Sequence, residues 1–330
     1  MKRILLIAVA LAATMTAAAQ NIAVVNPSNE TSIYQTLGDA ITNAAPGSTI
    51  YLPGGGHQIS DDIKIDKKLT IMGVSHRGEN NADGATIISG NLNFIGGSSG
   101  SAVLGVYITG NINVGNSEGA VENFTVKYCN ANSIQVGNSA SSGMVVNQCY
   151  LRNTSSFGNC NINIENNILH SINYVNGGVI NHNVITYYSV FNWSSYYCAA
   201  FNEVSNSSIT NNFVLDGGNY FHTGSNCYIS HNCNGTGSWG DNPIVLDVGK
   251  TWDDIFRAHK GVSISSDYSL KDGVDKSKFK GTDGTTIGIE GGSGFDPDAL
   301  APIPRIVSKK VDEQSDASGK LTINVTVKSK

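Results

Sequence analysis

The sequence has little charge, and it has no long apolar segment after its first residues. Only 14% of its 330 residues are Asp, Glu, Lys or Arg, and the formal net charge is −5. Proteins that bind the phosphate backbone of nucleic acids need clustered Lys and Arg, which this balance does not supply. A membrane-spanning helix needs roughly 20 apolar residues in a row. We therefore expect neither a nucleic-acid partner nor a membrane-spanning protein.

Cysteine is also scarce, and no two cysteines form a CxxC pair. Zinc and redox sites built on such pairs are therefore not indicated. Cys129 and Cys149 each end a segment with aliphatic residues, where a free Cys is a common small core residue. Buried thiols are the favoured interpretation, and disulfides, which export would permit, are the alternative. The six cysteines are Cys129, Cys149, Cys160, Cys198, Cys227 and Cys233.

The N-terminus carries the features of a secretory signal peptide. Lys2 and Arg3 precede the apolar stretch 4–13, and small residues end at Ala19. This order is typical of a signal peptide over residues 1–19. A membrane anchor is the weaker alternative, because threonines interrupt the apolar run. We expect an exported protein that is periplasmic, bound to the cell surface or extracellular.

Gly, Asn, Ser and Thr are abundant in the rest of the chain, as in β-rich proteins with many turns. Apolar residues at every fourth position predict an amphipathic helix between Thr31 and Pro46. Short alternating strands with tight turns follow at 49–53, 54–59 and 63–73. This order, ending in Asp-Lys-Lys-Leu-Thr-Ile-Met-Gly at residues 66–73, resembles the first coils of pectin-lyase-like β-helix proteins. The resemblance covers about residues 32–73 and implies a fold more than a reaction.

From about residue 86, one strand motif recurs with loops of variable length between its copies. In each copy an aliphatic residue is followed two or three positions later by an amide, and stacked coils would bring these amides into columns. A buried amide ladder fits, because each amide donates and accepts along a stack with a spacing of roughly 4.8 Å. Surface turns are the alternative. The expected column is Gln148, Asn167, Asn183, Asn212 and Asn232.

The predicted fold is all-β, a right-handed parallel β-helix (solenoid) with an N-terminal capping helix and a short C-terminal β appendage. The predicted divisions are a signal peptide (1–19), an N-terminal cap with the first coils (20–85), central coils (86–250) and a C-terminal cap with the appendage (251–330). Alternating Leu321, Ile323, Val325 and Val327 predict a terminal strand with one buried face. An antiparallel sandwich is disfavoured, because it does not require the recurring amide.

The resemblance implies either an acidic calcium cluster beside an Arg or Lys, as in lyases, or a carboxylate pair, as in hydrolases. The aligned motifs place Lys127 and Arg152 in similar columns, but put Asp216 too far from Arg152 for one calcium site. They place Glu122 and Glu165 at the same position of their motifs, roughly 10 Å apart, which is the upper limit for a catalytic carboxylate pair. Two carboxylates that simply face solvent are the favoured interpretation. No catalytic residue is predicted.

Metal and histidine sites are not indicated either. His182 and His231 share an offset held elsewhere by Asn, and membership of a polar ladder is the favoured interpretation. Four carboxylates near the C-terminus are a weaker calcium alternative without a recognised loop pattern. We therefore predict no cofactor and no metal. The four carboxylates are Asp283, Glu290, Asp296 and Asp298.

The longest insertion between strand motifs is rich in aromatic residues interleaved with polar ones. Such a surface suits stacking on sugar rings, with the polar tips of Tyr and Trp forming hydrogen bonds. An extra coil with inward-facing aromatics is an equal alternative. The candidate binding residues are Tyr187, Tyr188, Trp193, Tyr196 and Tyr197, with Tyr220 and Trp239 on later coils.

The function predicted from these features is that of an exported, monomeric β-helix protein. It binds a polysaccharide or cell-surface glycan, or acts as a surface interaction module, without an evident catalytic site. A polysaccharide lyase or glycoside hydrolase of the pectin-lyase-like type is one alternative, and a structural adhesin is another.

Overall fold

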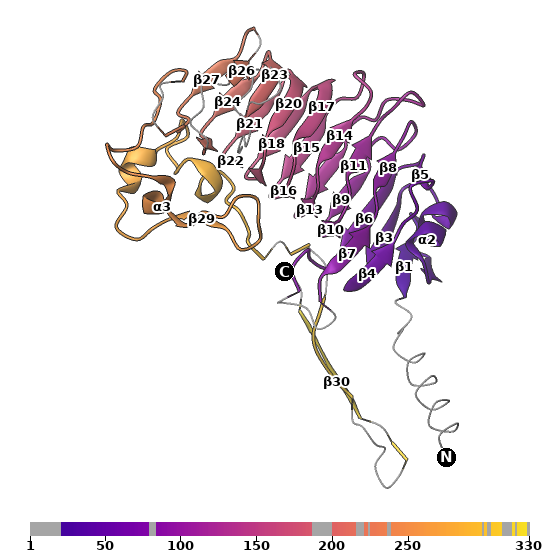
Figure 1. The fold of residues 1–330 in the computed structure, drawn as a ribbon. Coiled ribbons are helices and arrows are strands. Elements are labelled where there is room, and N and C mark those ends of the chain that lie inside the picture. Colours follow the sequence, from indigo (N-terminus) through magenta and orange to yellow (C-terminus); the bar gives the residue numbers. More distant parts are fainter. Residues whose placement is uncertain are drawn as a thin grey trace, which may run out of the picture.

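The computed structural model describes residues 21–78, 84–186, 200–215, 221–223, 225–235, 239–298, 300–301, 305–311, 319–320 and 322–328. Successive strands stack in register into three long sheets, so the predicted parallel β-helix is confirmed (Figure 1). The described residues contain no helix that is long and apolar enough to cross a membrane.

Sheet A is the longest of the three. Its strands pair in parallel from β3 onward, and β1 and β2 pair antiparallel at the N-terminal end. In sheet order it contains β2 (Thr31–Tyr34), β1 (Ile22–Val25), β3 (Ser48–Leu52), β6 (Leu69–Gly73), β9 (Ala102–Leu104), β12 (Thr125–Lys127), β15 (Met144–Asn147), β18 (Ile162–Glu165), β21 (Val179–Asn181), β24 (Ser208–Thr210) and β27 (Tyr228–Ser230).

Sheets B and C complete each coil. Sheet B contains β4 (Gly55–Gln58), β7 (Thr86–Ser89), β10 (Tyr107–Ile108), β13 (Asn130–Ala131), β16 (Tyr150–Leu151), β19 (Ile168–Leu169), β22 (Val184–Ile185) and β25 (Phe213–Val214). Sheet C contains β5 (Lys64–Ile65), β8 (Leu92–Phe94), β11 (Ile112–Val114), β14 (Ile134–Val136), β17 (Ser155–Cys160), β20 (Ile172–Asn176), β23 (Phe201–Ser205) and β26 (Phe221–Thr223).

The core follows from the alternation within each short strand. In β11, Ile112 and Val114 point inward and are fully buried, while Asn113 between them faces outward. Parallel pairing stacks like positions, so the inward residues of all coils form one continuous apolar core. Cys129, Cys149, Cys160 and Cys233 are buried free thiols and Cys227 is partly buried, which confirms the thiol interpretation for these five residues.

Each later coil turns from sheet A to sheet B through one residue with left-handed backbone geometry. Gln148, Asn166, His182 and Asn211 occupy this corner with φ between 51° and 60°. Asn tolerates positive φ better than most residues. The following residue points into the interior, and at Asn167, Asn183, Asn212 and Asn232 it is a buried amide. The predicted amide ladder is therefore confirmed for these four residues.

The sequence alignment was wrong by one residue at Gln148. The register pairs Val146, not Val145, with Ile164, so Cys149 takes the ladder position and Gln148 lies at the outward corner. The Cys149 thiol lies 3.3 Å from the Asn147 carbonyl, a contact like the one that Asn167 Nδ2 makes with Glu165 at 2.8 Å.

The helix of the N-terminal cap is shorter than predicted. Thr31–Tyr34 forms strand β2, and the helix α2 spans only Leu37–Asn43. Thr36 caps α2 by accepting the Asp39 backbone N–H at 3.1 Å. Ile33 fits the helical spacing, but it is 54% exposed on β2.

The chain after β27 covers the outer face of sheet B. The outward residues of its later strands are apolar, and they form a second core with the C-terminal cap (Figure 1). Tyr150, Ile168, Val184 and Phe213 are the outward residues in this core. The cap contains α3 (Trp252–Ile255), β28 (Phe256–Ala258), β29 (Asp267–Leu270) and the 3₁₀ turns η1 (Lys276–Phe279) and η2 (Gly288–Glu290).

The predicted C-terminal strand exists, but its apolar face is not buried. Strands β30 (Arg305–Val311) and β31 (Ile323–Lys328) form an antiparallel hairpin that extends away from the coils (Figure 1). Ile323, Val325 and Val327 are 48–59% exposed. The prediction that one face of this strand is buried is therefore wrong within a single chain.

Candidate functional site

Most of the predicted aromatic surface cannot be placed. Tyr187, Tyr188, Trp193, Tyr196, Tyr197 and Tyr220 lie outside the described residues. Trp239 is described, and its half-buried ring packs against the main core, with its centroid 5.3 Å from that of Phe201. Trp239 thus helps to close the last coils.

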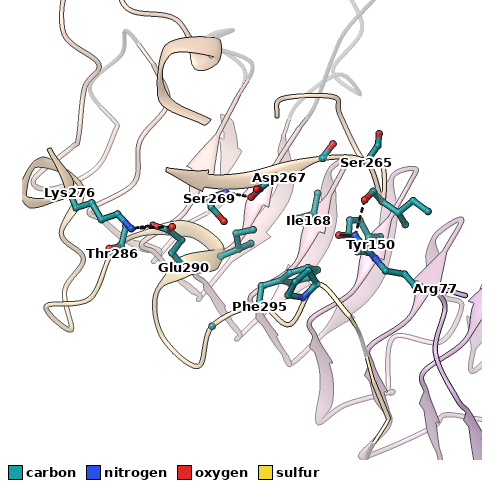
Figure 2. Close-up of a pocket in the computed structure, with 15 residues that line it drawn as sticks. Arg77, Tyr150, Ile168, Ser265, Asp267, Ser269, Lys276, Thr286, Glu290 and Phe295 are labelled. Carbon is teal, nitrogen blue, oxygen red and sulfur yellow. Dashed lines mark hydrogen bonds and ion pairs between the residues drawn. The ribbon is translucent and has the colours of Figure 1, made fainter. Parts of the chain in front are cut away.

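A cleft of about 600 Å³ lies between the outer face of sheet B and the C-terminal cap. Figure 2 shows Arg77 and Tyr150 at one end, Lys276 and Glu290 at the other, and Phe295 between them. The volume falls within the range of small-molecule sites. Sequence reasoning missed the cleft, because its lining residues come from four separate parts of the chain.

Aromatic rings form one end of the cleft. The Tyr150 ring meets Phe295 edge to face, with centroids 5.3 Å apart, and meets His76 in the same way at 5.3 Å. Tyr150 is buried, and Phe295 is partly exposed. Phe295 is therefore the aromatic ring that a ligand would touch.

Arg77 joins the coils to the cap beside these rings. Its Nη2 donates to Tyr150 Oη at 2.9 Å and to the Ile264 carbonyl at 2.8 Å. The guanidinium lies 5.9 Å from the Tyr150 ring centroid. Its Nε is buried and has no hydrogen-bond partner among the described residues, which also provide no ion pair for this side chain. Arg77 thus provides a cationic side chain at the cleft.

The opposite end is polar. Lys276 Nζ pairs with Glu290 Oε2 at 3.0 Å. Asp267 Oδ1 accepts the Ser269 backbone N–H at 3.0 Å. Hydroxyl groups also line the cleft: Thr286 lies near Lys276, and Ser265 lies near Tyr150 (Figure 2).

Burial sets the protonation states beside Arg77. It lowers the pKa of His76 to about 4, against a smaller raising effect of the hydrogen bond with the Tyr128 carbonyl. It also raises the pKa of the Tyr150 hydroxyl, although the positive charge of Arg77 opposes this shift. At neutral pH both groups are therefore uncharged, and Arg77 supplies the charge at this end.

The carboxylates with predicted roles do not converge. Glu122 bridges to Ser142, whereas Glu165 aligns with Asn147, so the offset that the alignment gave the two Glu residues is wrong. Asp283 contacts His182, and Glu290 pairs with Lys276. No group of three or more His, Cys, Asp and Glu residues in the described ranges could hold a metal ion.

The predicted cationic column is also wrong. Lys127 aligns with Asn147, and Arg152 lies beyond the end of β16. The guanidinium of Arg152 stacks over the Tyr107 ring at 4.8 Å and donates to the Ile108 carbonyl at 2.9 Å. Arg152 therefore stabilises neighbouring coils.

Residues 281–298, here called the return segment, hold the cap against the coils. The segment runs back along the corner column, and four outward corner side chains contact it. Sequence reasoning found the polar column but not this partner. The contacts are Asn211 Oδ1 with Thr282 N (2.8 Å), His182 Nε2 with Asp283 Oδ2 (3.0 Å), Asn166 Nδ2 with Gly291 O (2.8 Å) and Gln148 Oε1 with Asp296 N (2.8 Å).

His182 is the most buried of these contacts, because its side chain is only 1% exposed. Its Nδ1 lies 3.2 Å from the Gly288 carbonyl, so both ring nitrogens face acceptors of the return segment. Burial raises the pKa of Asp283, but hydrogen bonds from Thr285 and His182 together outweigh this effect and leave it below the usual range. The pair thus fixes the segment that forms one wall of the cleft.

Family models, curated proteins and solved structures were all compared with this chain, and none matches it. The fold assignment therefore rests on the stacked strands and their register.

Proposed function

We propose that the protein is an exported β-helix protein that binds a saccharide in the cleft between sheet B and the C-terminal cap, without catalysing a reaction. The observation that carries the proposal is the Arg77 side chain, which lines the cleft beside an aromatic wall and forms no ion pair within the described residues. A hydrogen bond from a charged donor is stronger than one between neutral groups, so the guanidinium favours a ligand that carries acceptor oxygens.

The chemistry of the lining supports a sugar as the ligand. Sugars have apolar C–H faces and hydroxyl groups around their edges, so a site for them combines aromatic surface with many polar groups. Phe295 provides the partly exposed ring, Lys276 provides a donor at the other end, and Asp267 provides an acceptor between the two ends (Figure 2).

Binding without catalysis is proposed because the polar groups of the cleft already have structural contacts. Glu290 is paired with Lys276, and Asp267 accepts a backbone N–H. A general acid and base must both reach the reacting atoms.

Retention on a glycan array and on polysaccharide affinity gels tests the proposal. Phe295→Ala and Lys276→Ala should each weaken binding to a retained glycan by about tenfold, as expected for the loss of one good contact. Lys278→Ala is the matched control. Lys278 lies on the same 3₁₀ turn as Lys276 and forms a similar ion pair, with Asp247, but it does not line the cleft.

No retention on any glycan would overturn the proposal. Loss of retention only after the double change Trp193→Ala with Tyr196→Ala would move the site to the predicted aromatic insertion. New reducing ends or unsaturated products would instead indicate a hydrolase or a lyase.

A further inference from the structure

Sheet A has an open edge at its N-terminal end. Strand β2 is the terminal strand of the sheet and pairs only with β1 among the described strands. Thr31, Ser32 and Ile33 are exposed, and β2 contains no charged residue. Natural proteins usually protect such edges with charges or bulges, because unpaired backbone groups accept a further strand. This edge lacks that protection.

The C-terminal hairpin has a second open edge. In β31, Ile323, Val325 and Val327 face one side, and all six residues of the strand are exposed. An isolated two-stranded hairpin is marginally stable in water, and an apolar face on it needs a cover. The sequence alternation is that of a half-buried strand, although the chain itself leaves this face open.

The two edges of the hairpin differ in their protection. Strand β30 carries Arg305, Lys309 and Lys310, and lysine on an edge opposes the addition of another strand. Strand β31 carries one charge, Lys328, at its last residue. The unprotected edge of the hairpin is therefore β31.

Charge identifies the partner of this edge. Residues 20–301 contain 13 Lys and Arg and 23 Asp and Glu, which gives a net charge of −10. Residues 302–330 contain 6 Lys and Arg and 3 Asp and Glu, which gives +3. Two such hairpins repel each other, whereas the hairpin and the body of the protein attract. Glu30 directly precedes β2 in the sequence, and Asp39 lies in α2. Both residues are exposed.

We propose that β31 of one copy of this chain adds to the edge of β2 in a second copy and extends its sheet A. Strand addition satisfies the unpaired backbone groups of both edges. It also brings the aliphatic side chains of β31 next to Ile33, so apolar surface on both copies is buried together. This inference concerns a surface away from the cleft and does not depend on saccharide binding.

Sedimentation velocity of the full chain across a concentration series tests the contact. Ile33→Lys blocks the β2 edge and Val325→Lys blocks β31, and both positions are exposed, so the fold is retained. Each variant alone should associate about tenfold more weakly or not at all. Val248→Lys is the control, because Val248 is fully exposed and lies on neither edge. It should associate like the unchanged chain.

Mixing the two blocked variants gives the sharpest result. The Ile33→Lys chain keeps an intact β31, and the Val325→Lys chain keeps an intact β2. The proposal predicts a one-to-one heterodimer in the mixture, which high salt weakens. Pairing of two hairpins predicts instead that the Ile33→Lys chain dimerises by itself, and that result would overturn the proposal. An unchanged chain that stays monomeric but binds anionic vesicles would overturn it as well, in favour of a lipid surface.

Discussion

Two neighbouring columns at the corner between sheets A and B have opposite roles. The inner column, Asn167, Asn183, Asn212 and Asn232, joins each coil to the next. The outer column is one residue earlier in the chain, and its side chains hold the return segment. The two residues of each recurring Asn-Asn or His-Asn pair therefore have different roles. One stabilises the solenoid, and the other positions a wall of the candidate binding cleft.

The largest effect is expected from a change in the inner column. Asn183 Nδ2 donates to the Ile164 carbonyl at 2.9 Å, and Asn183 Oδ1 accepts the Asn167 backbone N–H at 3.0 Å. Asn183→Leu leaves these buried groups without partners, which should lower the free energy of unfolding by about 4 kcal/mol. Urea denaturation followed by circular dichroism measures this change.

The control for that prediction is an exposed amide ladder on the other side of sheet B. Asn153 Nδ2 donates to Asn132 Oδ1 at 2.6 Å, but the side chain is exposed to water. Asn153→Leu should therefore cost less than about 1 kcal/mol. Equal losses for the two variants would contradict the separate role of the inner column.

The second effect is a loss of stability in acid that depends on His76. Its Nδ1 donates to the carbonyl of Tyr128 at 3.0 Å, and Tyr128 has the same left-handed backbone geometry as the corner residues, with φ of 55°. The folded-state pKa of His76 is lowered to about 4, so the unfolded chain takes up the proton first as the pH falls. The contribution of His76 to the free energy of unfolding is therefore fully present above about pH 6.5, and about 3 kcal/mol is lost as the pH falls towards 4.

His76→Gln should flatten this pH dependence, since glutamine can donate to the same carbonyl but does not titrate. Denaturation at a series of pH values provides the measurement. His57→Gln is the comparison, because burial also lowers the pKa of His57. The same steep acid loss in His76→Gln would show that another group is responsible.

The smallest of the three effects concerns the return segment alone. A Cβ at Gly291 would lie 2.6 Å from His182 Cε1 and even closer to the Thr286 carbonyl oxygen. Gly291→Ala should displace the segment and lower stability by about 2 kcal/mol. Hydrogen exchange should accelerate at residues 286–292 and remain slow at the inner-column amides. Gly294→Ala, where the new Cβ meets no atom within 4 Å, should cost only about 1 kcal/mol for its positive φ.

The sequence allowed the coils and the inner amides to be predicted, because both depend on a local pattern that repeats. It failed at Gln148, where two adjacent valines, Val145 and Val146, leave the phase of the strand ambiguous by one residue. It also misplaced Ile33, whose spacing fits a helix although the residue lies on β2.

The cleft was beyond sequence reasoning for a different reason. Arg77 is 73 residues from Tyr150 and farther still from Ile264, and no periodic pattern connects such positions. The apolar outward residues of sheet B were the one available signal. Ile168 and Val184 occupy outward positions that are polar on an uncovered strand, so they indicated that another part of the chain covers this face.

The most direct test of the proposed binding site is a crystal structure of the protein with a glycan that it retains. We predict a sugar ring against Phe295, with its polar groups within hydrogen-bond distance of the Arg77 guanidinium and Lys276 Nζ. A glycan bound along the outer face of sheet C, or beside Trp193 and Tyr196, with the cleft empty, would contradict the proposal.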